Sequence, residues 1–205
     1  ADFIAREGSI FTTIAEVSRE IGASMLTLGT HGKVGAQKVF GSYALKVIER
    51  SPAPVIVVQK RDFRSGYRNI VLPIDDTSES KQKVKWAIHI ARKFNSAVHI
   101  FAMYSSESSR MARIKGNFNQ IRKFFDQNGI QHTSKICEKK GSFPKNLLSY
   151  SKEIDADLVL IMTNPDKLIP SFMMSKWEEQ ILFNDNLIPV MAINPIDFNI
   201  VVGGM

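Results

Sequence analysis

The feature of this sequence best suited to chemistry is a glycine-rich segment, 29–42, that follows an apolar run and precedes a run with helical spacing. A glycine loop between a strand and a helix suits phosphate, because glycine allows close backbone approach and a helix start presents free, partially positive N–H groups. The residues assigned to this candidate site are Gly29, Gly32, Gly41 and Ser42. Ser42 is suited to cap the helix and to donate to a phosphate oxygen. The alternative, glycines that form tight turns and a serine that only caps, stays open from the residues alone.

Other chemistries are less well supported. The loop matches neither the Walker A pattern nor Gly-x-Gly-x-x-Gly. The four histidines lack metal-ligand spacing, so no metal site is expected. His31 has no evident nucleophile or orienting carboxylate beside it, and we therefore expect no catalytic residues and no enzyme. Cys137 reads as a packed thiol in a strand.

The elements that must position the loop occur twice, because residues 7–58 match residues 140–193. Gly8 and Ser9 fall on Gly141 and Ser142, and the run Pro54-Val-Ile-Val-Val58 falls on Pro189-Val-Met-Ala-Ile193. Residues 67–139 have no counterpart before residue 7, so we expect the first repeat to lack its early strands. The domains predicted are 1–60 (the C-terminal part of a first domain), 61–66 (a linker), 67–195 (a complete second domain) and 196–205 (a tail).

Apolar runs and helical periodicity alternate along both copies. The first copy predicts helices over 10–21 and 42–50 and strands over 24–28 and 55–58. The second predicts strands over 68–74, 97–103, 131–138, 157–162 and 189–193, with helices over 80–94, 109–127, 143–154 and 175–183. This alternation favours an α/β fold with a doubly wound, Rossmann-like parallel sheet. Ligands of such sheets lie at the carboxyl ends of the strands, where the strand order reverses.

Composition narrows the class of protein. With 44% hydrophobic and 23% charged residues, the 205-residue chain can bury a core, and its apolar runs are too short to span a bilayer. The single cysteine and the absence of a signal-peptide pattern indicate a cytoplasmic protein. The net charge of +7 mostly serves solubility, and the basic helix over 109–127 is expected to be a solvated outer helix. We therefore expect no specific nucleic-acid partner and no membrane partner.

The loop and the strand after it resemble the universal stress protein family. Nucleotide-binding members carry Gly-x2-Gly-x9-Gly-Ser/Thr, a helix and a Pro-Val-x-Val-Val strand, and this chain has Gly29-x2-Gly32-x8-Gly41-Ser42 followed by Pro54-Val-Ile-Val-Val58. The run Asn69-Ile-Val-Leu-Pro-Ile-Asp75 is similar to the family's first strand and its terminal aspartate. The spacer is one residue shorter than in the family, so we expect a tighter loop with shifted phosphate contacts.

The resemblance implies an adenine-nucleotide-hydrolase-like fold that holds ATP, with Mg²⁺, in the first-domain loop. Gly29 and Gly32 would lie along the ribose and phosphates, and Gly41 and Ser42 would bind phosphate. It also implies that the last strands of the two domains pair edge to edge, so that the tandem acts as a built-in dimer and self-association uses these strands.

The second copy lacks the glycines of the loop. Gly29, Gly32 and Gly41 are replaced by Met162, Pro165 and Met174, and Ser175 alone persists. We therefore expect the second domain to bind nucleotide poorly or not at all, because side chains fill the space and Pro165 has no N–H to donate.

Three functions follow from these observations. The leading one is a non-enzymatic, regulatory stress-response protein that binds an adenine nucleotide. The alternatives are a nucleotide-free scaffold for dimerisation or interaction, and an enzyme that hydrolyses ATP or transfers an adenylate.

Overall fold

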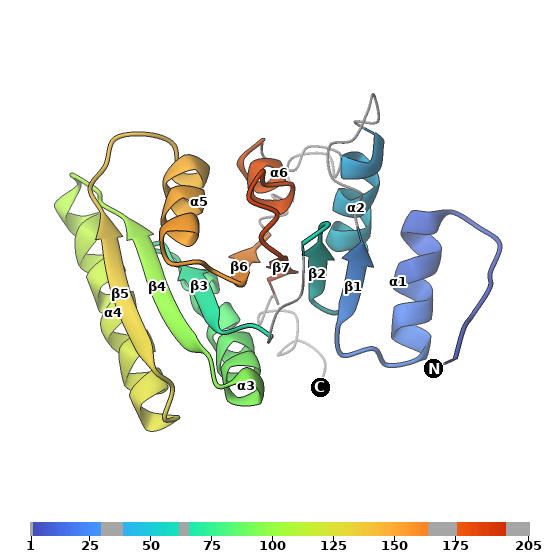
Figure 1. Ribbon diagram of the computed structural model, residues 1–205, viewed down its shortest axis with the longest axis horizontal. Coiled ribbons are helices and arrows are strands. Elements are labelled where there is room, and N and C mark those ends of the chain that lie inside the picture. Colours follow the sequence, from blue (N-terminus) through green and yellow to red (C-terminus); the bar gives the residue numbers. More distant parts are fainter. Residues whose placement is uncertain (1, 30–38, 62–65, 164–175, 196–205) are drawn as a thin grey trace, which may run out of the picture.

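The computed structural model describes residues 2–29, 39–61, 66–163 and 176–195. Its centre is one seven-stranded sheet with the order β1-β2-β7-β6-β3-β4-β5 (Figure 1). The strands are β1 (Leu26–Gly29), β2 (Val55–Val58), β3 (Asn69–Pro73), β4 (Ala97–Met103), β5 (His132–Cys137), β6 (Leu158–Met162) and β7 (Val190–Ile193). Neighbouring strands are parallel except for β2 and β7, which run antiparallel. The predicted doubly wound α/β fold is therefore confirmed.

Helices cover both faces of this sheet (Figure 1). They are α1 (Ile10–Glu20), α2 (Val39–Arg50), α3 (Val84–Phe94), α4 (Ser108–Gln127), α5 (Phe143–Glu153) and α6 (Lys176–Leu182), with a 3-10 turn η1 (Glu79–Lys83) before α3. One buried cluster joins α3 and α4 to the sheet, and a second joins α2, α5 and α6 to the opposite face. No helix in the described parts of the chain is long and apolar enough to cross a membrane.

Two helix boundaries differ from the sequence predictions. The helix expected to begin at Ser42 begins at Val39, so Ser42 lies within the first turns of α2 and its predicted role as the N-cap is wrong. The segment expected to be helical from Ser80 starts as the 3-10 turn η1 and becomes an α-helix only at Val84. Short 3-10 turns are common at helix N-termini, and periodicity does not distinguish them.

The two repeats are joined through their last strands. β2 and β7 pair antiparallel, with Ile56 opposite Met191, so the edge-to-edge pairing that the family resemblance implied exists within one chain. Each of these strands also has a parallel neighbour on its other side, β1 for β2 and β6 for β7. Association between separate chains through the last strands stays a prediction, and both edges of β2 and β7 are already paired here.

β1 and its counterpart β6 differ sharply in burial. β6 lies between β7 and β3, and Leu158, Val159, Leu160 and Ile161 are each at most 1% exposed. β1 is the edge strand and pairs, within the described residues, with β2 alone, and its residues alternate between half-buried and exposed. Large exposed apolar side chains gather in the same part of the chain: Phe3, Ile4, Ile10, Ile21 and Met25.

Candidate functional site

A cavity of about 760 Å³ opens at the carboxyl ends of three strands of the second repeat. From β3 the chain adds β4 and β5 on one side, and β6 and β7 lie on the other, so the strand order reverses between β3 and β6. The cavity is lined by Pro73, Ile74 and Asp75 after β3, by Met103, Tyr104 and Ser105 after β4, and by Ile161, Met162 and Thr163 at β6. It therefore lies where a doubly wound sheet binds its ligands.

The turn after β3 is fixed by its own polar side chains. One carboxylate oxygen of Asp75 accepts hydrogen bonds from the Thr77 backbone N–H at 2.9 Å and from the Thr77 hydroxyl at 2.6 Å. The amide nitrogen of Asn117, on α4, donates to the backbone oxygens of Asp75 at 2.9 Å and of Thr77 at 3.2 Å. Asn117 is 8% exposed. A buried amide on a long helix thus holds this turn against the cavity.

A buried ammonium group forms part of the cavity wall. Lys83, the last residue of η1, is 4% exposed, and its Nζ donates a hydrogen bond to the Pro73 backbone oxygen at 2.5 Å. Burial lowers the pKa of Lys83 to about 8, although the nearby Asp75 carboxylate acts in the opposite direction. The cavity therefore contains a cation that the protein has largely removed from water.

The charged rim of the cavity is an ion-pair cluster. Asp76 accepts from Arg110 Nε at 2.9 Å and, through its second carboxylate oxygen, from Arg113 Nη2 at 2.9 Å. The hydrogen bond from Arg113 in particular lowers the pKa of Asp76. Of these three residues, Arg110 lines the cavity. The negative charge of Asp76 is thus paired with two arginines of α4.

The opposite wall is apolar and aromatic. Phe143, at the start of α5, and Trp177, in α6, lie with ring centroids 5.5 Å apart in an edge-on arrangement. Both line the cavity together with Met162. Met162 occupies the position of Gly29 in the first repeat, so a half-buried thioether side chain stands where the first repeat has no side chain.

The four residues predicted to bind phosphate belong to the first repeat in sequence, whereas the residues that line this cavity belong to the second. Gly29 ends β1, is exposed, and has nothing within 4 Å of the position that a Cβ would take. Gly41 and Ser42 lie in the first turns of α2. Gly32 lies outside the described residues, as do Pro165, Met174 and Ser175 of the second repeat. The strand and the helix on either side of the loop are therefore confirmed, while the predicted phosphate contacts stay a prediction.

Sequence reasoning missed Lys83. The signal is its spacing, because Lys83, Ala87 and Ile90 follow one another at i, i+4 and i+7, and the latter two are 0% and 5% exposed. A charged residue on an apolar stripe is the exception that marks a buried ion.

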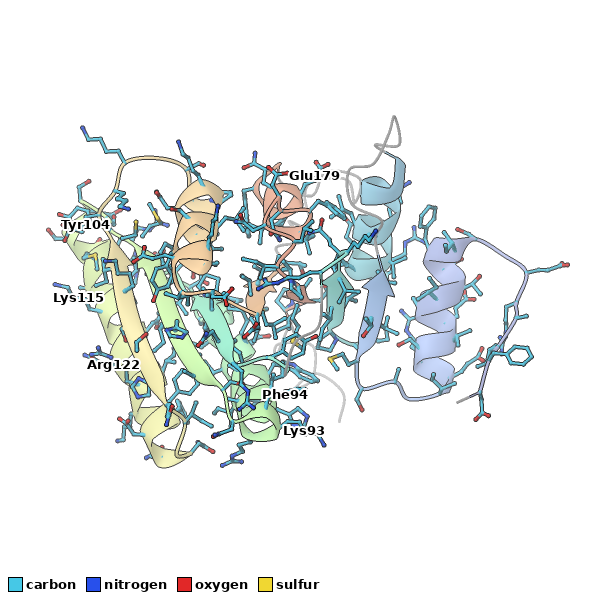
Figure 2. All side chains as sticks on the ribbon, viewed as in Figure 1. Lys93, Phe94, Tyr104, Lys115, Arg122 and Glu179 are labelled. Carbon is cyan, nitrogen blue, oxygen red and sulfur yellow. The ribbon has the colours of Figure 1, made fainter. Side chains whose placement is uncertain are left out.

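The remaining charged groups form no metal cluster in the part of the chain that the structure describes. Lys115 and Arg122 lie along the outer side of α4, exposed, and Arg122 Nε donates to Ser134 on β5 at 2.9 Å (Figure 2). Tyr104 stands at the carboxyl end of β4, beside the cavity (Figure 2).

Comparison with known proteins gives one family. The model of the universal stress protein family matches residues 1–59 and 66–176. No curated protein sequence matches the chain.

Several solved structures share the fold. A universal stress protein of Archaeoglobus fulgidus DSM 4304 superimposes with a TM-score of 0.73 at 17% identity, over 91% of this chain and 66% of that protein. A functionally unknown protein of Pseudomonas aeruginosa PAO1 gives 0.63 at 15% identity, over 93% and 69% of the two chains. A universal stress protein in complex with cAMP gives 0.52 at 17% identity, over 62% and 97%. The chain thus spans about two thirds of the first two proteins, and these likenesses concern the fold.

Proposed function

The chain belongs to the universal stress protein family, and from that premise we propose that it is a regulatory stress-response protein that binds an adenine nucleotide through the glycine loop of its first repeat. ATP with Mg²⁺ is the ligand we propose, with Gly29, Gly32, Gly41 and Ser42 as its contacts. The protein acts by binding and not as an enzyme. We place it in the cytoplasm, since its one cysteine, Cys137, is buried and unpaired.

The observation that carries this proposal is the open end of β1. The exposed Gly29 leaves its backbone accessible, and α2, twelve residues long, starts ten residues later at Val39. In a helix that begins at Val39, the N–H of Gly41 is among those without an intrahelical acceptor. A phosphate oxygen would satisfy that donor and gain from the helix dipole.

A related fold is known with an adenine nucleotide bound, the universal stress protein in complex with cAMP. The second repeat, by contrast, has Met162 at the position of Gly29, and the first turn of α6 contains Glu178 and Glu179. These two carboxylates oppose a polyphosphate. We therefore propose one nucleotide per chain.

The test is native mass spectrometry of the 205-residue chain with ATP, ADP, AMP and cAMP, with and without Mg²⁺. Gly41→Leu is expected to abolish the added nucleotide mass. The matched control is Gly116→Leu, because Gly116 is also helical, in α4, with open space around its Cβ position. Nucleotide retention by Gly41→Leu would contradict the proposal.

The alternative function, a nucleotide-free scaffold, is favoured by the continuous sheet through β2 and β7. This pairing fixes the two repeats relative to one another without any ligand. Absence of bound nucleotide at millimolar ATP would move the assignment to the scaffold.

A further inference from the structure

The cavity of the second repeat contains a cation with donors to spare. A lysine ammonium has three N–H donors, and among the described residues the hydrogen-bond acceptor of Lys83 Nζ is the Pro73 backbone oxygen. Lys83 is 4% exposed, so its ammonium group is largely removed from bulk water, while its side chain still lines the cavity. Burying a charged group without matching acceptors costs free energy, and an acceptor oxygen brought into the cavity would recover part of it.

Asp75, the acidic residue near Lys83, is a poor acceptor for the remaining N–H donors of the ammonium group. Asp75 attracts Lys83 electrostatically, but the structure gives no hydrogen bond between the two side chains, and an Asp75 oxygen is occupied by Thr77. Asp75 is also exposed, so its charge is well solvated. Lys83 is therefore the less satisfied member of the two.

A second source of positive potential meets the same cavity. The eleven-residue helix α5 starts at Phe143, and its N-cap Ser142 makes no side-chain capping bond. Gly141, Ser142 and Phe143 all line the cavity. Free N–H groups at this helix start favour an anion, and they add to the effect of the buried ammonium.

The rest of the lining suits an apolar body. Met103, Phe143, Met162 and Trp177 are half-buried side chains of the wall, and Ile161 is 1% exposed. At about 760 Å³ the cavity has the size of a typical small-molecule site. Its chemistry differs from that of the glycine loop, which offers backbone donors to several phosphate oxygens.

We propose that the cavity of the second repeat binds a small organic acid, a molecule with one carboxylate on an apolar body. The carboxylate accepts hydrogen bonds from Lys83, and the apolar body packs against Phe143 and Trp177. The cavity is lined by residues of the second repeat, and the glycine loop belongs to the first, so the chain holds two ligand sites of different chemistry, one in each repeat.

Fluorescence of Trp177 reports on this site directly. The only other tryptophan, Trp86, is a half-buried residue of α3 that packs against the core, and Trp86→Phe leaves Trp177 as the sole indole. The probe is 8-bromooctanoate, whose bromine quenches a tryptophan on contact. We expect saturable quenching, and competition by octanoate but not by octan-1-ol.

The decisive variant is Lys83→Met, which keeps the length of the side chain and removes the charge. Its matched control is Lys85→Met, because Lys85 is exposed and lies two residues further along. We expect Lys83→Met to weaken binding at least tenfold and Lys85→Met to leave it unchanged. Calorimetric titration of octanoate into the chain with both tryptophans gives the same comparison if Trp86→Phe does not fold.

Four results would overturn the proposal. Three are no saturable binding, equal affinity in Lys83→Met and the parent, and octan-1-ol that binds as well as octanoate. The fourth is displacement of the probe by ATP, since the cavity would then be a nucleotide site. Gly41→Leu separates this site from the proposed function, because it is expected to lose nucleotide and to keep the acid.

Discussion

Asn194 donates a hydrogen bond from Nδ2 to the backbone oxygen of Ser51 at 3.0 Å and thereby ties the end of β7 to the chain that leaves α2. A matching hydrogen bond runs from the first repeat to the second, because Gln59 Nε2 donates to the backbone oxygen of Asn184 at 3.1 Å. Gln59 and Asn194 each directly follow the last strand of their repeat, and Ser51 and Asn184 each follow the end of the helix before that strand. The junction therefore has an approximate twofold symmetry in its side chains as well as in its strands.

Asn194→Ala is expected to lower the free energy of unfolding by about 1–3 kcal/mol, because carbonyl oxygens at the end of α2 lose their donor. The same amide also donates to the Ile48 oxygen at 2.7 Å. Urea denaturation measures the change. Asn119→Ala, an exposed asparagine of α4, serves as the control and is expected to change stability by less than about 0.5 kcal/mol. Equal effects of the two substitutions would mean that the junction bonds contribute nothing.

Lys83 is expected to make stability depend on alkaline pH. Its folded-state pKa of about 8 lies below the ordinary lysine value of 10.5, so between these values the unfolded chain binds more protons. The loss of stability that comes from burying the charged Lys83 is therefore present in full below pH 8, and it is relieved as the pH rises toward 10.5. Relative to Lys83→Met, the free energy of unfolding of the parent should increase by on the order of 3 kcal/mol between these two pH values.

Denaturation at pH 7, 8, 9 and 10 measures this difference. Lys85→Met is the control, and its difference from the parent in the free energy of unfolding should stay constant over this range. Binding of octanoate should weaken over the same range, because the neutral amine loses its charge. The other ionisable groups of the cavity are Asp75, Glu79, Arg110 and Tyr104. A pH-independent difference between the parent and Lys83→Met would show that Lys83 does not titrate there.

Asn117 is expected to act on the cavity through the turn it holds. Asn117→Leu removes the donors to the Asp75 and Thr77 oxygens, so the turn after β3 loosens and the affinity for octanoate falls several-fold. Asn119→Leu, on the exposed side of the same helix, should leave the affinity unchanged. Hydrogen exchange of the Thr77 amide distinguishes a loosened turn from a general loss of stability, which would also raise exchange in β4.

The edge of β1 is expected to carry any association between chains. Edge strands present unpaired N–H and C=O groups, and a lysine in such a strand opposes pairing with another chain. Thr27→Lys, at an exposed position of β1, should therefore reduce the dimer fraction in sedimentation velocity. Thr133→Lys, on the opposite edge strand β5, is the comparison. A larger effect of Thr133→Lys would place the contact at β5.

Most of the fold could be predicted from the sequence, because buried parallel strands are continuous apolar runs and the helices between them show clear spacing. The strand expected at 55–58 has those bounds, and the helix expected at 10–21 ends one residue earlier, at Glu20. The start of α2 was misplaced, since Ser42 resembles a cap in sequence while the helix extends back to Val39.

The candidate site was harder to predict. The sequence indicated the carboxyl ends of the strands, and the cavity at β3, β4 and β6 lies there. The importance of Lys83 depends on a backbone oxygen ten residues away, which residue types do not reveal, and on burial, which its spacing with Ala87 and Ile90 indicates. The second repeat lacks the glycines of a phosphate loop, and their absence carries no information about ligands of other chemistry.

The pairing of β2 with β7 has a consequence for dilution. Two separate chains that paired through such strands would dissociate as their concentration fell. Here residues 59–68 link the first repeat, which contains β2, to the second repeat, which contains β7. The connection fixes the effective concentration of each half near the other, whatever the amount of protein present. The junction should therefore remain formed in single molecules at picomolar concentration, and the arrangement of the two repeats becomes a property of the chain and not of its abundance.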